Sequence, residues 1–131
     1  DTFKPRIELT APRLGDLLTL DDTGFRAVFS ASPVKRIGRN RFIRNVLVAA
    51  GNSGDHTLSS AVVPLLEDPD PVIRGTAVWA LSCLLPVQDF RILSIPYAQN
   101  ETDRTVLVEW HLGQLAPAEN MGSEKQEPEE P

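Results

Sequence analysis

The sequence predicts an all-α protein, folded as a short right-handed α-solenoid in which successive pairs of helices stack. Three observations lead to this fold class. Apolar residues recur at helical spacing through the middle of the chain, Asp and Pro residues stand where helices would begin, and three apolar segments superimpose at one fixed spacing. Each helix pair is too small to bury its own apolar face, so neighbouring pairs are expected to share one core.

The strongest helix boundaries lie around residues 68–71, which read Asp-Pro-Asp-Pro. Asp70 can accept hydrogen bonds as an N-cap, and Pro71 can occupy the first helical position because its missing N–H is not needed there. A helix is therefore expected from Pro71 to about Leu85, ended by Pro86, whose ring disfavours helical geometry at the preceding residue.

Further helices are expected from the same signals. Asn40 and Asp55 are predicted N-caps of two helices that precede the Asp-Pro turn. The expected helices other than 71–85 cover residues 12–20, 22–30, 41–51, 56–67 and 87–97.

The repeat assigns core positions. The spacing of 31 residues superimposes Phe42 on Ile73, Val46 on Ala77 and Val108, Ala50 on Leu81 and Leu112, Leu84 on Leu115, and Trp79 on Trp110. We expect these side chains to be buried, with repeats over residues 34–116 and a lead-in of two short helices over 1–33. Residues 117–131 are acidic and proline-containing, which predicts a disordered tail.

Charge is divided unevenly along the chain. The net charge is −5, yet residues 1–44 carry nine basic and five acidic residues. Five of the basic residues fall in one run, 34–45, that contains no acidic residue. Such a cluster on an acidic protein indicates a surface for a phosphate-rich polymer. The candidate nucleic-acid-binding residues are Lys35, Arg36, Arg39, Arg41 and Arg44.

Helical geometry places part of this basic run in solvent. At 100° per residue Phe42 and Val46 share the inward arc, whereas Arg41 and Arg44 lie on the opposite one. The free amides of a helix start attract phosphate, and arginine supplies planar paired donors. A purely structural interpretation stays open, in which one or more of these side chains form a solvated face or pair with acidic residues of the preceding helices.

Catalytic and metal sites are not predicted. Cys83 is the single cysteine, so no internal disulfide can form, and its apolar segment favours a buried small side chain. His56 and His111 are far apart with no carboxylate or thiol at ligand spacing. No apolar run approaches the ~20 residues of a membrane-spanning helix, so a soluble cytoplasmic protein is expected.

Two sets of residues carry a family resemblance. Residues 65–81, with the Asp-Pro turn and the apolar-Arg-x-x-Ala core, resemble a HEAT-like repeat. A longer ordered set resembles the C-terminal region of epoxyqueuosine reductase over about residues 3–115. Its motifs are Pro5-Arg6, Leu9-x-Ala11-Pro12, Leu17-Leu18-x-Leu20, Phe25-Arg26-x-x-Phe29, Ser32-Pro33, Lys35-Arg36-x-Gly38-Arg39, Phe42-x-Arg44-Asn45-Val46 and Gly51-Asn52-Ser53-Gly54.

The resemblance implies the last part of a longer enzyme, and a chain that begins at Asp1 without Met fits that expectation. The family places a cobalamin-binding domain first and a segment with two 4Fe-4S clusters second. A HEAT-like region that helps to hold the tRNA anticodon stem-loop comes last. The implied reaction reduces epoxyqueuosine to queuosine at the tRNA wobble position. No catalytic, cofactor-binding or metal-binding residue carries over, because a four-iron cluster needs about four thiolates and this chain has one cysteine.

Two function classes therefore follow from the sequence. In the first, the chain is the tRNA-binding end of an epoxyqueuosine reductase, contacts the RNA backbone and docks on the missing N-terminal domains as a monomer. In the second, it is a HEAT-like protein-interaction scaffold without nucleic acid. The two differ in salt dependence, because binding to phosphates weakens steeply as salt rises.

Overall fold

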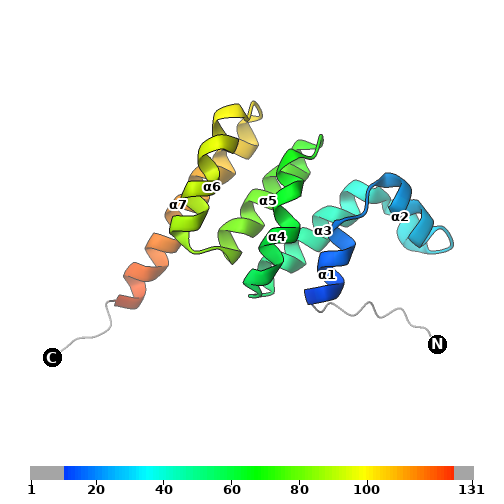
Figure 1. Cartoon of the computed structure of the whole chain (residues 1–131), viewed down its shortest axis with the longest axis horizontal. Helices are drawn as coiled ribbons and strands as arrows, with labels where there is room; N and C mark the ends of the chain where they lie inside the picture. Colours follow the sequence, from blue (N-terminus) through cyan, green and yellow to red (C-terminus); the bar gives the residue numbers. More distant parts are fainter. Residues whose placement is uncertain (1–10, 126–131) are drawn as a thin grey trace.

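The structure is a computed structural model that describes residues 11–125, and its regular elements within that range are all helices. The prediction of an all-α protein is confirmed. The elements are α1 (Ala11–Leu18), α2 (Asp22–Phe29), η1 (Pro33–Ile37), α3 (Gly38–Asn52), η2 (His56–Leu58), α4 (Ser59–Val62), η3 (Val63–Glu67), α5 (Pro71–Leu84), α6 (Val87–Asn100) and α7 (Arg104–Lys125) (Figure 1).

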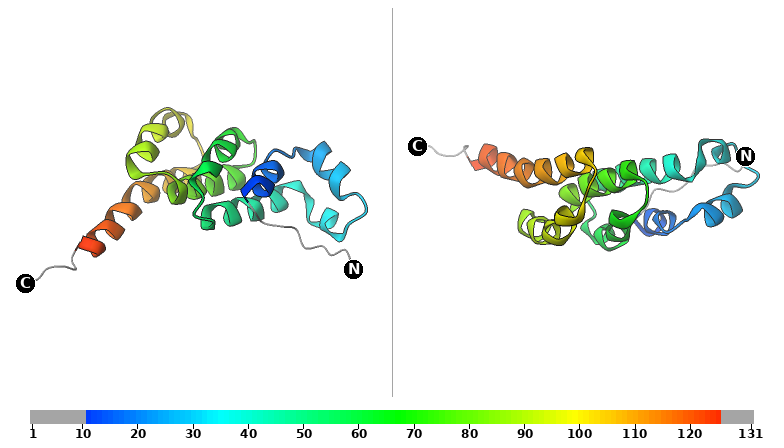
Figure 2. Two further views of the ribbon diagram at one scale, coloured as in Figure 1. Left: turned by 60° about the horizontal axis from the view of Figure 1, so that its bottom comes forward. Right: turned by 90° about the horizontal axis from the view of Figure 1, so that it is seen from above.

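The helices lie in two layers. One layer is the row α3, α5 and α7, in which α5 packs against both of the others, and the second contains α1, α4 and α6 (Figure 2). Helices α1 and α4 pack on α3 and α5 respectively, and α6 packs mainly on α7. This layering suits stacked helix pairs, while the right-handed solenoid stays a prediction.

Helix α5 follows the sequence prediction closely. The side chain of Asp70 accepts a hydrogen bond from the amide of Val72, and Pro71 occupies the first turn. The helix ends at Leu84, two residues before Pro86. Its buried face makes it the centre of the fold, because it contacts both neighbouring helices of its layer.

Helix α3 begins earlier than predicted, at Gly38, and the expectation that Asn40 caps it was wrong. The preceding residues form the 3-10 helix η1, whose cap is Ser32 accepting from the amide of Val34. Gly38 joins the two helices with φ of 82°, a left-handed value that favours glycine. The basic run is therefore helical on both sides of one glycine joint.

The second layer is less regular than expected. The predicted helix over 56–67 is divided into η2, α4 and η3, and Pro64 lies where the α-helical turns give way to a 3-10 helix. Proline lacks an N–H donor, which explains the break. The predicted cap at Asp55 is confirmed, since its carboxylate accepts from the amide of Thr57. Helix α6 continues to Asn100, beyond the predicted end at 97.

The disordered tail expected over residues 117–131 stays a prediction. Helix α7 continues to Lys125 and so includes residues 117–125, and residues 126–131 lie outside the described residues. Ala, Glu, Met and Lys, all good helix formers, make up much of this stretch.

The last repeat is two positions longer than the sequence pattern predicted, since the capping residues Asp70 and Asp103 of α5 and α7 stand 33 positions apart (103 − 70). In the turn before α5, the carboxylate of Asp68 accepts a hydrogen bond from the amide of Asp70. The carboxylate of Asp70 in turn accepts one from the amide of Val72. In the turn before α7, the carboxylate of Glu101 accepts a hydrogen bond from the amide of Asp103. The carboxylate of Asp103 in turn accepts one from the amide of Thr105. The same pair of hydrogen bonds thus recurs in both turns, and the predicted spacing does not extend to the last unit.

The exposed fractions of the side chains confirm that the last repeat is shifted by two positions. Ala77, Leu81 and Leu84 are buried, but the residues that the predicted spacing superimposes on them are 47 %, 50 % and 46 % exposed. Those residues are Val108, Leu112 and Leu115. Trp110 is buried against Phe90 of α6, at a ring-centroid distance of 5.2 Å. Because α6 is longer than predicted, α7 starts two residues late and buries a different face.

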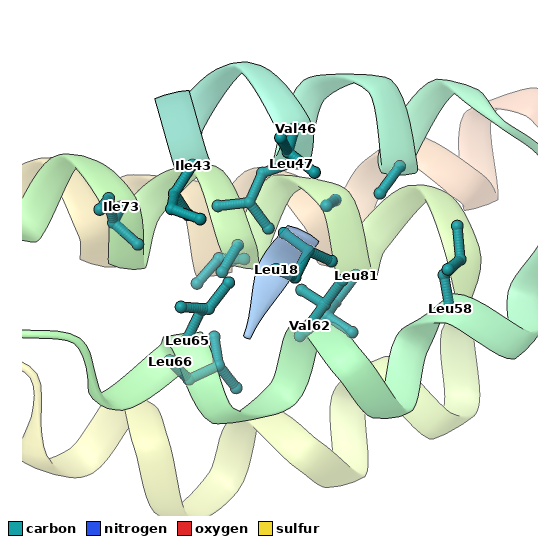
Figure 3. Packing of buried hydrophobic residues seen from close by; sticks show 14 of the residues in the cluster. Leu18, Ile43, Val46, Leu47, Leu58, Val62, Leu65, Leu66, Ile73 and Leu81 are labelled. Atoms are coloured by element: carbon teal, nitrogen blue, oxygen red, sulfur yellow. The ribbon is translucent and has the colours of Figure 1, made fainter. Parts of the chain in front are cut away.

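The core is continuous between the layers. Ile43 and Leu47 of α3 and Leu81 of α5 meet Val62 and Leu65 of the second layer (Figure 3), and all five side chains are buried. Leu18 brings α1 into the same cluster. This apolar contact sets the spacing of α3 and α5, and thereby the edge formed by their starts.

Close packing between α3 and α5 depends on Gly51, which lies against the partly buried ring of Trp79. An added Cβ there would lie 2.8 Å from Cη2 of Trp79. We expect Gly51→Ala to lower the free energy of unfolding by about 1–3 kcal/mol, despite the better helix propensity of alanine. Chemical denaturation measures the change.

Gly15→Ala is the matched control, because its Cβ would meet no side-chain atom closer than 3.8 Å. Removing glycine from a helix there should leave stability unchanged or raise it by about 0.5–1 kcal/mol. Equal effects of both substitutions would contradict the close packing between Gly51 and Trp79.

Candidate nucleic-acid interface

The basic run occupies the corner between α2 and α3. Phe25 and Phe29 of α2 pack on Phe42, with ring centroids 4.9–5.4 Å apart, and all three side chains are buried. This aromatic cluster fixes η1 and the start of α3 on the body of the protein. The cations of the run are therefore presented from a rigid corner.

Lys35 and Arg36 lie at the outer end of the corner, and both are exposed. They border an open hollow of about 610 Å³, which we call the corner hollow. Its lining residues are Ser30, Ala31, Ser32, Pro33, Lys35 and Arg36. With two cations and no carboxylate, the corner hollow suits an anion.

Arg41 and Arg44 are exposed on the outer side of α3, as predicted from helical geometry. They face the start of α5 across a second hollow of about 250 Å³, the junction hollow, completed by Asn40, Asp70 and Val72. One carboxylate, that of Asp70, stands beside two guanidinium groups there. From the sequence, Asp70 was expected only to cap a helix, and its distance from Arg41 along the chain gave no signal of this juxtaposition.

Arg39 differs from the other four candidates. Its Nη1 donates to Oδ1 of Asp68 at 2.8 Å, and its Nε donates to the carbonyl of Leu20 at 3.0 Å. The side chains of Arg39 and Asp68 are only 14 % and 6 % exposed. The geometry therefore gives Arg39 a bracing role, and the candidate phosphate contacts are the remaining four residues.

Arg74 repeats this bracing one unit further along. Its guanidinium donates twice to Glu101, with both distances 2.9 Å, and also to the carbonyl of Asp68 at 3.0 Å. Each arginine lies near the start of one helix in the layer of α3, α5 and α7, and it binds the turn before the next helix of that layer. The starts of α3, α5 and α7 are thereby held side by side along one edge, which we call the helix-start edge.

These ion pairs shift the pKa values of their members. Hydrogen bonds from Arg74 hold the pKa of Glu101 below its usual value, while the same interaction raises the pKa of Arg74. A hydrogen bond from Thr105 likewise lowers the pKa of Asp103 in the same turn. The carboxylates of the last turn therefore stay charged to unusually low pH.

A third hollow, of about 470 Å³, lies between the starts of α5 and α7, and we call it the acidic hollow. Its charged lining residues are Glu67, Asp68, Arg74 and Glu101, and Tyr97 and Trp110 form part of its wall. Arg74 is already bonded to Glu101, so carboxylates dominate this hollow.

No catalytic group was predicted, and Cys83 does not have the surroundings of one. It is exposed, so its predicted burial was wrong, and partial desolvation raises the pKa of its thiol. A raised thiol pKa disfavours a reactive thiolate. Among the side chains that the structure describes, those of residues 13–115, no group of three His, Cys, Asp or Glu could hold a metal ion. The helices of this range include none that is long and apolar enough to cross a membrane.

Fold and site together define a class: an all-α protein of layered helix pairs with a cationic corner at one end of the helix-start edge. Two of its sequence relatives are epoxyqueuosine reductases. This chain is 31% identical over 97 residues to epoxyqueuosine reductase of Escherichia coli K12. The alignment covers 67% of this chain and 25% of the relative. The enzyme of that name from Yersinia pestis is 42% identical over 84 residues, covering 63% of this chain and 20% of the relative.

Solved structures agree with the sequence relatives. A crystal structure of epoxyqueuosine reductase with an epoxyqueuosine-modified tRNA-Tyr stem loop superimposes with a TM-score of 0.71 and 26% identity, covering 78% of this chain and 27% of that one. A structure of the enzyme from Bacillus subtilis gives the same values. The chain matches no protein-family model.

In sequence and in fold, the chain is therefore similar to one part of epoxyqueuosine reductases, and the resemblance inferred from its motifs is confirmed. It spans about a quarter of the length of these relatives, with coverage of 25% in Escherichia coli K12.

The Arg39–Asp68 pair gives a stability prediction. Arg39→Met leaves a nearly buried carboxylate without its cation, so we expect a loss of about 3–5 kcal/mol in the free energy of unfolding. Chemical denaturation measures it. The control is Arg26→Met, which removes a pair with Asp22 whose side chains are 68% and 65% exposed and should cost less than about 0.5 kcal/mol. A loss no larger than that of the control would show that Arg39 is not a brace.

The lowered pKa of Glu101 predicts a pH dependence. A carboxylate with a depressed pKa adds stability above its usual value of 4.5 and loses it as pH falls through the lower folded-state value. Glu101→Gln should therefore lower stability by about 1.5–3 kcal/mol at pH 7, and the difference from wild type should shrink below pH 4.5. Chemical denaturation at pH 7 and at low pH measures the stability difference between the variant and wild type at each pH. A difference that stays constant would contradict a lowered pKa of Glu101.

Proposed function

We propose that this chain is the tRNA-binding C-terminal part of an epoxyqueuosine reductase. The observation that carries the proposal is the set of exposed cations at the corner and junction hollows: Lys35, Arg36, Arg41 and Arg44. The structural neighbour solved with a modified tRNA stem loop supports RNA as the ligand.

The physical basis is contact with the sugar-phosphate backbone. Arginine offers planar paired donors that match phosphate oxygens, and lysine adds a mobile point charge. Backbone contacts fix the position of an RNA but carry no base information. In this proposal the chain positions the anticodon stem-loop, and recognition of the modified base lies elsewhere in the enzyme.

The proposed parent enzyme reduces epoxyqueuosine to queuosine at the tRNA wobble position with cobalamin and two 4Fe-4S clusters. The residues of this chain do not fit either cluster, because each needs about four thiolates and the chain has only Cys83. Its proposed share of the work is binding alone, through repeats over residues 34–116 that dock on the other domains of a cytoplasmic monomer.

A scaffold without nucleic acid is the second candidate. It is favoured by the apolar stripe that α7 leaves open, formed by Val108, Leu112 and Leu115. Exposed apolar side chains at helical spacing suit a protein partner. Binding through such a stripe would respond weakly to salt, whereas phosphate binding falls steeply with it.

RNA titration tests the proposal. The chain should bind an anticodon stem-loop with an affinity that falls steeply between about 50 and 200 mM salt. The double variant Lys35→Ala/Arg36→Ala should weaken binding and reduce the slope of log affinity against log salt by about 1.5–2, because two phosphate contacts are lost. Fluorescence anisotropy of a labelled stem-loop measures both quantities.

Arg91→Ala is the control, because Arg91 is an exposed cation on α6, away from the corner and junction hollows. It should change neither affinity nor slope appreciably. A flat salt response of the wild-type chain, or equal losses in all variants, would exclude the corner as an RNA site.

A further inference from the structure

The charge of the helix-start edge changes sign along its length. The corner hollow has two cations and no carboxylate. The junction hollow has two guanidinium groups and one carboxylate, and the acidic hollow has three carboxylates and one guanidinium. The formal charges of the lining residues are therefore +2, +1 and −2 in this order, and Arg39, which pairs with Asp68 from outside the lining, reduces the last to −1.

Ion pairs neutralise most of the charges in the acidic hollow. Arg74 and Glu101 neutralise each other in a nearly buried pair, and Asp68 is held by Arg39. Among the lining residues of the acidic hollow, Glu67 then contributes an exposed charge, whose side chain accepts only a long 3.4 Å hydrogen bond from Tyr97. Asp70, in the lining of the neighbouring junction hollow, adds a second negative charge.

The geometry points to a boundary for the RNA: the strand enters at the corner hollow, passes the junction hollow and leaves the protein at the start of α5, where Glu67 and Asp70 repel the next phosphate. This inference rests on the proposed function and adds to it the extent and direction of the RNA footprint. Glu67 and Asp70 act in it as charges that restrict the ligand, since neither offers a donor to a phosphate.

The chain allows this repulsion to be removed without breaking the fold. Asp70 caps α5 through Oδ1, and asparagine caps helices equally well through the same atom. Gln at position 67 keeps an acceptor for Tyr97. Glu67→Gln/Asp70→Asn therefore changes charge at the boundary while conserving shape and hydrogen bonding, and thermal denaturation can verify that the variant is folded.

The test measures affinity of the full chain for an anticodon stem-loop RNA by fluorescence anisotropy. At about 50 mM salt the double variant should bind roughly five-fold more tightly, because two like charges near the strand are gone, and the gain should vanish at high salt. Asp89→Asn is the matched control, since Asp89 is exposed in the first turn of α6, and α6 reaches the helix-start edge only at its other end. Asp89→Asn should leave affinity within about two-fold of wild type.

Two outcomes would overturn the boundary. Equal gains in the double variant and in Asp89→Asn would mean that net charge alone governs binding. No gain in the double variant would mean that RNA does not approach the start of α5. If Lys35→Ala/Arg36→Ala still loses binding, the proposed function survives either outcome, and if it does not, the function itself fails.

Discussion

The structure depends on two nearly buried ion pairs that join the start of each helix in one layer to the turn before the next. Arg39 binds Asp68, and Arg74 binds Glu101, so each unit is attached to its successor at the same edge. A buried pair of this kind contributes little net stability over an apolar contact, but it is costly to break and specifies one arrangement. The hollows between the helix starts keep their shapes and charges because these pairs hold them.

This arrangement separates two uses of arginine within a few residues of sequence. Arg39 is directed between the helices and donates to a carboxylate and a carbonyl, whereas Arg41, two positions later, is exposed. A rotation of about 200° along the helix accounts for the difference. Charge density in a sequence therefore shows where a cationic surface is built, and geometry shows which members of the cluster remain available to a ligand.

The sequence was sufficient for the helical class, the cap at Asp70 and the outward direction of Arg41 and Arg44, because each follows from local rules. It was insufficient wherever a distant residue decided the result. The start of α3 is set by the glycine joint after η1, and the role of Arg39 is set by Asp68, which belongs to the turn before the next helix of the layer. Exposure of Cys83 follows from the face that α5 turns outward, which no local pattern specified.

The two extra residues before α7 have a consequence for how such a chain can change in length. Two positions correspond to about 200° of helical rotation, so the stripe that a strict repeat would bury points to solvent instead. Val108, Leu112 and Leu115 are that stripe. The same capping hydrogen bonds begin α5 and α7, so the two helices start in the same phase and only the sequence is shifted, by two positions. A chain of this kind can therefore lengthen a second-layer helix without rotating the next helix, because the turn that carries the capping hydrogen bonds sets that helix's phase.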